Sequence, residues 1–228
     1  MNYAKNKKYL GGNDTHYYIG LGLVILGVLL FMLGEMMWIF IVPYQLFVAS
    51  FLALIGALLI CIPSAGASNE EEIDKYVKDK IETLTSRVTE SMPKSKNQTQ
   101  ESPTVVGNYI FDKEDIIIRK GRKDGKYRSS LYSAAAISYK KESVYIHQCT
   151  FSLVSDVTSE NVYDIPFSEK PEASISEETL NLNKRAIKIK RLTISDEQGT
   201  KITIPVINSV LIDEICDKLN TITKRYKA

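Results

Sequence analysis

The 228-residue sequence has few residues that could carry covalent or metal chemistry. Its three cysteines, Cys61, Cys149 and Cys216, lie far apart and form no C-x-x-C pair. This spacing argues against a disulfide framework and against a structural zinc site, and it fits a reducing compartment. Only two histidines occur, His16 and His147. The sequence therefore predicts neither a metal site nor a cofactor.

Known catalytic motifs are missing as well. The sequence has no G-x-S-x-G, no H-E-x-x-H and no phosphate-binding glycine loop followed by Lys and Ser or Thr. His147 and Cys149 would share one face of a strand, but a thiol–imidazole pair also needs a third group to orient the base. The net charge is only +2, and no nucleic-acid reader motif occurs. We therefore expect neither an enzyme nor a nucleic-acid-binding protein.

One long apolar region lies near the N-terminus. From Tyr17 to Ile62 the only charged residue is Glu35. A single helix of this length would be about 69 Å long, roughly twice the apolar core of a bilayer. We therefore predict a two-helix transmembrane hairpin over residues 17–62, with its second span beginning near Pro43. A cleaved signal peptide is a poorer explanation, because no small-residue cleavage site follows the first apolar run.

Lysines flank this hairpin only on its outer sides. Residues 1–16 contain Lys5, Lys7 and Lys8, whereas the connecting turn contains no lysine or arginine. Three further lysines follow the second span: Lys75, Lys78 and Lys80. Because positively charged flanks remain in the cytoplasm, we expect both termini there. The prediction is a two-span protein of the inner (plasma) membrane, with residues 1–16 as a cytoplasmic tail and the lipid bilayer around its spans.

Small residues form a stripe on each predicted span. The stripes consist of Gly20, Gly27 and Gly34 on the first span and of Ala49, Ala53 and Ala57 on the second. Such stripes let two helices approach closely in lipid. They predict either packing within the hairpin or association between copies of the chain, so a homo-oligomer through the spans stays open.

An amphipathic helix is predicted over residues 68–92. Its apolar positions, from Ile73 to Val88, recur at steps of three or four residues, and the glutamates at 70–72 suit the start of a helix. We interpret this helix as a stalk, whose apolar stripe could pair two copies of the chain. Residues 93–104 are polar with two prolines, and they predict a disordered linker.

The last part of the chain, residues 105–228, reads as short strands and turns followed by a helix. Apolar and polar residues alternate over 201–206, and a shift of the apolar phase near Lys190 predicts a bulge in the preceding strand. An apolar stripe from Val210 to Ile222 predicts a C-terminal helix.

About seven antiparallel strands followed by one C-terminal helix resemble the pleckstrin-homology-like fold. Together with the N-terminal hairpin, the chain resembles bacterial membrane proteins that carry such a domain. The resemblance implies a bent antiparallel barrel with one end capped by the helix. The predicted fold class is therefore a transmembrane helical hairpin plus a mainly-β (α+β) cytoplasmic domain.

Two clusters of basic residues stand out in this domain. They consist of Lys120, Arg122, Lys123, Lys126 and Arg128 around a turn, and of Lys184, Arg185, Lys188, Lys190 and Arg191 in a later strand. The resemblance implies headgroup binding near the first cluster, because many members of the wider superfamily bind phosphoinositides at this hairpin tip. Each basic residue near an anionic leaflet adds about 1 kcal/mol of attraction. If the clusters share a face, they predict a surface for anionic lipid headgroups; if they lie apart, they are ordinary solvated charge.

The expected function is binding. We expect a membrane-anchored, non-enzymatic scaffold whose domain presents a surface to an unidentified protein partner. The alternative is a sensor, whose barrel binds an anionic small molecule such as a nucleotide second messenger and drives the spans to associate. A polar barrel interior would favour the sensor. An apolar interior closed by the C-terminal helix would favour the scaffold.

Overall fold

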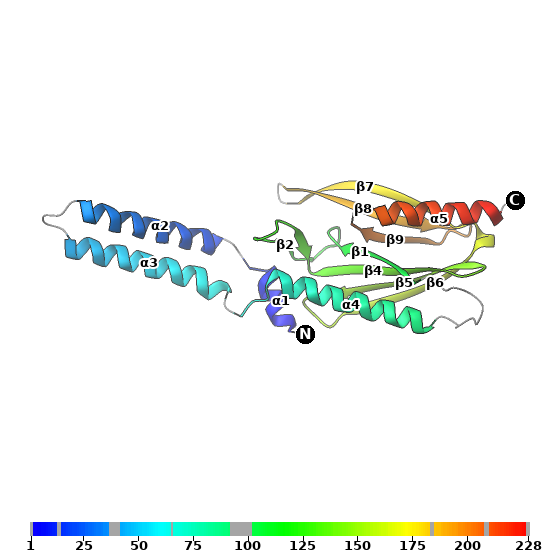
Figure 1. Ribbon diagram of the computed structural model, residues 1–228, viewed down its shortest axis with the longest axis horizontal. Coiled ribbons are helices and arrows are strands. Elements are labelled where there is room, and N and C mark those ends of the chain that lie inside the picture. The colour runs from blue at the N-terminus through cyan, green and yellow to red at the C-terminus, as the bar shows by residue number, and fades with distance from the viewer. Residues whose placement is uncertain are drawn as a thin grey trace. The chain divides into compact units, whose positions relative to one another are not determined.

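The computed structural model describes residues 2–12, 15–36, 42–64, 66–91, 102–182, 185–207 and 210–226. These residues belong to two compact units, residues 2–69 and 70–228 (Figure 1). The first unit is helical, and the second contains two α-helices and three β-sheets within the described residues. The chain is therefore α+β, with N-terminal helices and a mainly-β part.

The first unit contains three helices, α1 (Tyr3–Leu10), α2 (Thr15–Met36) and α3 (Val42–Ser64). Sequence reasoning missed α1, whose first turn is capped by the Asn2 side chain, which accepts a hydrogen bond from the Lys5 backbone N–H at 3.2 Å. In α2 the stretch Thr15–Leu33 is long and apolar enough to cross a membrane. In α3 the apolar stretch within the described residues is shorter, Leu46–Cys61. By length and composition, the described residues thus give one helix of spanning length.

The second unit begins with helix α4 (Glu70–Ser91), which packs on a four-stranded antiparallel sheet. In the order β1-β4-β5-β6, its strands are β1 (Thr104–Tyr109), β4 (Leu131–Tyr139), β5 (Ser143–Ser152) and β6 (Thr158–Pro166). The Tyr76 ring of α4 meets the Phe151 ring of β5 edge to face, with ring centroids 6.0 Å apart. At the other end of the helix, Arg87 forms an ion pair with Glu160 of β6 at 2.8 Å.

The apolar stripe of α4 is used for packing within the chain. Val77, Leu84 and Val88 are buried, and the neighbouring strand β4 carries Ala134 and Ala136, both fully buried. Small side chains at these two positions let the helix lie close to the sheet. The predicted helix over 68–92 therefore exists. Its apolar stripe, which we interpreted as a surface that could pair two copies of the chain, packs against a sheet of the same chain. The predicted linker lies mostly outside the described residues.

A three-stranded sheet and the C-terminal helix complete the core. The sheet has the order β7-β8-β9, with strands β7 (Glu172–Leu182), β8 (Arg185–Ser195) and β9 (Lys201–Val206). After β9 comes α5 (Val210–Tyr226). One apolar cluster joins side chains of both sheets to Ile212, Ile215 and Leu219 of this helix. The core thus lies between the two sheets and α5.

The predicted bent antiparallel barrel does not close. Within the described residues the strands form three separate sheets, of four, two and three strands. The edges of β1 and β9 approach each other, and the Asn108 side-chain amide donates to the Val206 carbonyl at 3.2 Å, but no ladder joins the two strands. Side chains of α5, rather than a continuous sheet, close the apolar interior.

The predicted bulge near Lys190 is wrong. Strand β8 pairs with β7 residue by residue along its whole length, and with β9 without an extra residue. Because neighbouring side chains alternate between faces, Ile187 and Ile189 lie on the opposite side of β8 from Leu192 and Ile194. The first pair is buried beside Phe111, whereas the second belongs to the main core. The phase shift in the sequence thus marks a change of buried face.

The smallest sheet is a hairpin of β2 (Ile118–Lys120) and β3 (Tyr127–Ser129), and it carries the first basic cluster at its turn. A single turn of 3₁₀-helix, η1 (Phe167–Glu169), connects β6 to β7. Ser130 separates β3 of this hairpin from β4 of the four-stranded sheet. Here the Ser130 N–H donates to the Ile117 carbonyl at 2.9 Å and the chain leaves one sheet for another.

Candidate functional site

The turn of the β2–β3 hairpin is bound to the acidic first turn of α4. The Glu70 carboxylate accepts hydrogen bonds from the backbone N–H groups of Arg122 at 2.6 Å and Lys123 at 3.3 Å. The Lys123 ammonium lies 3.5 Å from the Glu71 carboxylate. Exposed ion pairs of this kind contribute little on their own. The two backbone hydrogen bonds, however, fix the position of the turn against the helix.

Arg128 is the centre of this contact. Its side chain is only 1% exposed, and its guanidinium donates to Asp74 of α4 through Nε at 2.8 Å and Nη2 at 2.6 Å. The same guanidinium donates to Asp124 of the turn through Nη1 at 3.2 Å and Nη2 at 2.8 Å. Two bidentate carboxylates satisfy the planar donor set of one arginine. We call Arg128, Asp74 and Asp124 the clasp.

The clasp shifts the pKa values of Asp124 and Arg128. Hydrogen bonds from Arg128 are the main cause that lowers the pKa of Asp124 to about 2. Hydrogen bonds to Asp74 raise the pKa of Arg128 above its usual value, although burial opposes this. Both carboxylates therefore form ion pairs with a guanidinium that stays charged. Arg128 cannot act as the predicted contact for an external anion, because its donors are used inside the chain.

The other residues of the first basic cluster are more open. Lys126 has an exposed side chain, and the structure gives it no ion pair among the described residues. The Lys120 ammonium lies 5.7 Å from the centre of the Tyr127 ring. Arg122 is exposed beside the contact with α4. With Lys123, these residues remain the predicted anionic-contact surface of this hairpin.

The second basic cluster is mostly paired with acids. Lys188 and Lys190 lie 3.8 and 3.3 Å from the Glu177 carboxylate of β7. Arg191 forms ion pairs with Asp112, at 2.6 Å, and with Glu178, and these hydrogen bonds raise its pKa. Lys184 and the side chain of Arg185 lie outside the described residues. Much of this charge is neutralised locally.

A groove brings the two basic clusters together. We call it the α4–β8 groove; it has a volume of about 590 Å³ and is lined from α4, β1, the β2–β3 hairpin, β8 and Ile207. Its floor is apolar and aromatic, and its rim carries cations. The floor includes Tyr109, Phe111, Tyr132 and Ile187, and the rim includes Lys78, Lys126 and Lys188. One lysine of each predicted cluster therefore lines the same cavity.

The tyrosines of the floor are held by their neighbours. The Tyr109 and Tyr132 rings meet edge to face with centroids 5.0 Å apart, and the Tyr109 hydroxyl donates to Asp74 at 3.3 Å. Burial is the main cause that raises the pKa of Tyr109, and it raises the pKa of Tyr132 to about 12. Both phenols are neutral at ordinary pH. The clasp and the groove floor thus share Asp74 as a common member.

A second, polar cavity of about 360 Å³ lies elsewhere in this unit. It is lined by residues of β4, β5, β6, β8 and β9, among them Arg191. The Ser133 hydroxyl accepts hydrogen bonds from Gln148 at 3.3 Å and Thr150 at 3.0 Å, and Gln148 also donates to the Thr203 carbonyl. Along β5, the apolar residues Val144 and Ile146 share a face with these polar ones, because their positions alternate.

No hydrogen bond joins His147 to Cys149 among the described residues. The His147 ring nitrogen lies 3.1 Å from the Glu160 carboxylate, which also pairs with Arg87 of α4. Burial is the main cause that raises the pKa of Cys149, which favours the protonated thiol over the reactive thiolate. These residues lie on the sheet face that carries α4, and their contacts are those of packing.

In the first unit, the small-residue stripes lie where α2 meets α3. A Cβ at Gly20 would lie 2.7 Å from the Gly56 carbonyl, and one at Gly27 would lie 2.8 Å from the Ala49 carbonyl. Ala53 also lies in this contact, whereas Ala57 is exposed. The surroundings of Gly34 lie outside the described part of the structure. Sequence reasoning missed Gly56, whose added Cβ would lie 2.6 Å from the Gly20 carbonyl.

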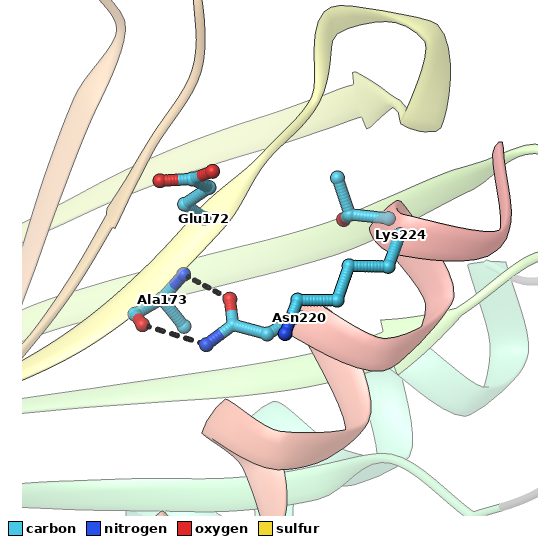
Figure 2. A pocket seen from close by; sticks show the side chains of 5 residues that line it. Glu172, Ala173, Asn220 and Lys224 are labelled. Atoms are coloured by element: carbon cyan, nitrogen blue, oxygen red, sulfur yellow. Dashed lines mark hydrogen bonds between the residues drawn. The ribbon is translucent and has the colours of Figure 1, made fainter. Parts of the chain in front are cut away.

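The side chain of Asn220 in α5 forms hydrogen bonds with the backbone at the edge of β7. The Asn220 amide accepts from the Ala173 N–H at 3.0 Å and donates to the Ala173 carbonyl at 3.1 Å (Figure 2). A cavity of about 250 Å³ lies beside it, lined by Glu172, Thr223 and Lys224. The amide thus occupies the first backbone groups of the β7 edge, where a further strand could otherwise begin.

Comparison with known proteins gives no relative for this chain. No protein-family model matches it, and neither a curated protein nor a solved structure does. The functional conclusion therefore depends on the groove, the polar cavity and the helices themselves.

Proposed function

We propose that the chain is a membrane-anchored, non-enzymatic binding protein that uses the α4–β8 groove to hold a protein partner in the cytoplasm. The supporting observation is the way the interior is filled. Next to α5, the space between the sheets is apolar and is closed by Ile212, Ile215 and Leu219. A filled core leaves no room for a ligand at that end, and the α4–β8 groove outside it offers an aromatic floor for a partner.

The proposed anchor is a hairpin of two spans. Helix α3 has 23 residues, so it is about 35 Å long, enough for a bilayer core of about 30 Å. The sequence of α3 contains no charged residue. The close approach of α2 at Gly20 and Gly27 supports a hairpin in lipid. With lysines only on the outer flanks, both termini belong in the cytoplasm of a cell with an inner membrane.

The proposed fold of the second unit is pleckstrin-homology-like. A four-strand meander, a three-strand meander and a C-terminal helix follow in that order, which supports the resemblance. The β2–β3 hairpin is an insertion between the first two strands of the larger sheet. We further propose that Lys120, Arg122, Lys123 and Lys126 contact anionic lipid headgroups. Hydrogen-exchange protection of this hairpin in the full chain tests this contact: it should be salt-sensitive, present in nanodiscs of anionic lipid but not of phosphatidylcholine, and lost when these four residues become Glu.

Photo-crosslinking in native membranes tests the proposed function. A benzophenone amino acid replaces Ile207, which is 60% exposed at the groove, or Val162, which is 54% exposed on β6. We expect a discrete protein adduct from position 207 and none from position 162. Equal adducts at both positions, or none at 207, would contradict a groove that holds a partner. A membrane-impermeant maleimide at Asn2→Cys tests the orientation, since a cytoplasmic N-terminus reacts only after permeabilisation.

The polar cavity supports a second candidate function, the anionic-ligand sensor. Its Gln148 and Thr150 can donate hydrogen bonds to a nucleobase edge. Arg191, whose side chain is 22% exposed, can exchange Asp112 or Glu178 for a phosphate. Thermal-shift measurements on the full chain with a set of mononucleotides and cyclic dinucleotides test this candidate. A shift with one of them, abolished by Arg191→Met and not by Lys201→Met, favours the sensor. The absence of any shift leaves the groove as the binding site.

A further inference from the structure

Strand β8 is longer than its partner β9. It pairs with β7 over its whole length, Arg185–Ser195, but with β9 only over Lys190–Ser195. Beside Arg185–Ile189 no strand of the described residues pairs with the β9 side of β8. Backbone N–H and C=O groups on such an edge are a template for a further strand. The position where that strand would lie continues the line of β9 beyond Val206.

This open edge lies at the α4–β8 groove. Ile187 and Lys188 of the edge line the cavity, together with Ile207, the first residue after β9. The floor beneath the edge is a local apolar cluster of Phe111, Ile187 and Ile189, with the Tyr127 ring packed against it. A strand added here could therefore hydrogen-bond to the backbone of β8 along one edge and pack its side chains on the aromatic floor of the groove.

The free edge of β7 is a poorer template for a peptide. At its start, Asn220 already occupies the N–H and the carbonyl of Ala173 (Figure 2). Further along, residues 174–179 of β7 have exposed side chains and include Glu177 and Glu178. That edge offers no apolar floor, so we place the site at β8.

The charge of the rim defines the chemistry of the partner. Lys126 and Lys188 line the groove from opposite elements, and the Lys188 side chain is 77% exposed. Asp74, the acid among the lining residues, is bound by Arg128. Glu177 beside Lys188 is shared with Lys190, so the rim keeps a net positive charge. It selects acidic residues next to the apolar ones that fill the floor.

We propose that an extended segment of a partner protein, with alternating acidic and apolar residues, adds a strand to the free edge of β8 at Ala186–Ile189. This inference rests on the proposed function and names the partner's chemistry. Peptide backbone satisfies the hydrogen-bonding groups of the edge, its apolar side chains enter the groove, and its acids meet Lys126 and Lys188. An acyl chain could fill the groove but would leave the edge groups of β8 without partners, which is why a peptide fits better.

The test uses the full chain in nanodiscs of phosphatidylcholine and a fluorescein-labelled seven-residue peptide of alternating Glu and Val, followed by fluorescence anisotropy. Two control peptides accompany it. One is N-methylated at every second residue, so that its backbone cannot pair with a strand, and the other carries Lys in place of Glu. The variant Lys126→Glu/Lys188→Glu is compared with Lys113→Glu/Lys201→Glu, whose exposed lysines lie outside the groove.

We expect the acidic peptide to bind, and the groove variant to weaken binding at least tenfold while the control variant stays within twofold. N-methylation and the Lys peptide should each abolish binding. Equal binding of the N-methylated peptide would overturn strand addition, and displacement by oleate would then identify the groove as an amphiphile site. If no peptide binds although position 207 crosslinks a protein in membranes, this inference fails and the proposed function stands. If both fail, both are rejected.

Discussion

Asp74 and Arg128, 54 positions apart in the chain, form a bidentate ion pair with a shortest N–O distance of 2.6 Å. One partner belongs to helix α4 and the other to strand β3 of the hairpin. The pair holds α4 to the β-rich unit at one end, and Arg87 with Glu160 does so at the other. This attachment is the basis of the first two predictions.

Removing the carboxylate of Asp74 should destabilise the second unit. In Asp74→Asn the buried guanidinium of Arg128 keeps Asp124 as its only anionic partner. Losing one charged hydrogen-bond partner of a buried ion costs roughly 2 kcal/mol of unfolding free energy. Hydrogen-exchange mass spectrometry of the full chain should show faster exchange in β2, β3 and the first turns of α4. Asp79→Asn, an exposed change on the same helix, should leave exchange there as it was.

Acid should weaken the clasp in a defined pH window. The pKa of Asp124 is lowered from 3.8 to about 2, chiefly by hydrogen bonds from Arg128. A carboxylate with a lowered folded-state pKa contributes its full stability above the unfolded-state pKa, and this contribution is lost as the pH falls through the folded-state value. The unfolding free energy from urea titrations should therefore fall between about pH 4 and about pH 2.

Asp124→Asn should be less stable than the native chain at neutral pH and should show a smaller loss over that acidic window. Glu114→Gln, which changes an exposed carboxylate on the preceding loop, serves as the matched comparison. If the acid profile of Asp124→Asn equals that of the native chain, the clasp has no part in acid sensitivity.

The amide of Asn220 should be needed for the start of β7. In Asn220→Asp the donor to the Ala173 carbonyl is replaced by a second acceptor, so two oxygens face each other at the former 3.1 Å contact. A hydrogen bond lost with its partner left unsatisfied costs about 1–2 kcal/mol. Exchange of the amides at 172–175 should become faster. Asn181→Asp, an exposed change at the far end of β7, should not produce this effect.

The contact between α2 and α3 should depend on Gly20 and not on Gly22. A side chain at Gly20 would enter the space held by the Gly56 carbonyl, whereas nothing lies within 4 Å of a Cβ placed at Gly22. Spin labels on Cys61, the exposed native thiol, and on Thr15→Cys report the separation of the helices. Gly20→Val should lengthen or broaden the distance distribution, and Gly22→Val should leave it unchanged. Equal effects of the two would mean that the helices do not meet at this stripe.

Local patterns predicted the elements well, because hydrophobic periodicity is a local property. The helix expected over 68–92 is observed at Glu70–Ser91, and the strand expected at 201–206 is β9. The same patterns misled where one strand buries two faces. Ile187 and Leu192 lie in different apolar clusters, on opposite faces of β8. From the sequence alone, a one-residue bulge explains the shift in the apolar pattern between them equally well.

The candidate site was harder to predict, because its contacts join distant segments. The basic turn was visible in the sequence, but the glutamates at 70–72 were interpreted only as a favourable helix start, and Asp74 and Asp124 were not recognised as partners of Arg128. The signal that was available is the charge match between an acidic first turn, Glu70 to Asp74, and the basic turn at 119–128. Periodicity cannot reveal such a match. A search for complementary charge clusters across the chain would have suggested it.

The attachment of α4 changes the meaning of the segment that follows it. Helix α4 and strand β1 belong to the same unit, so residues 92–101 join two parts of one folded body. Shortening or lengthening that segment alters the size of a closed loop, whose entropic cost grows only slowly with length. The junction of the two units lies instead just before Glu70, where the buried Ser68 hydroxyl donates to the Asn6 side chain of α1 at 2.6 Å. Deletions at that junction, and not in the polar segment, would change how the two units are connected.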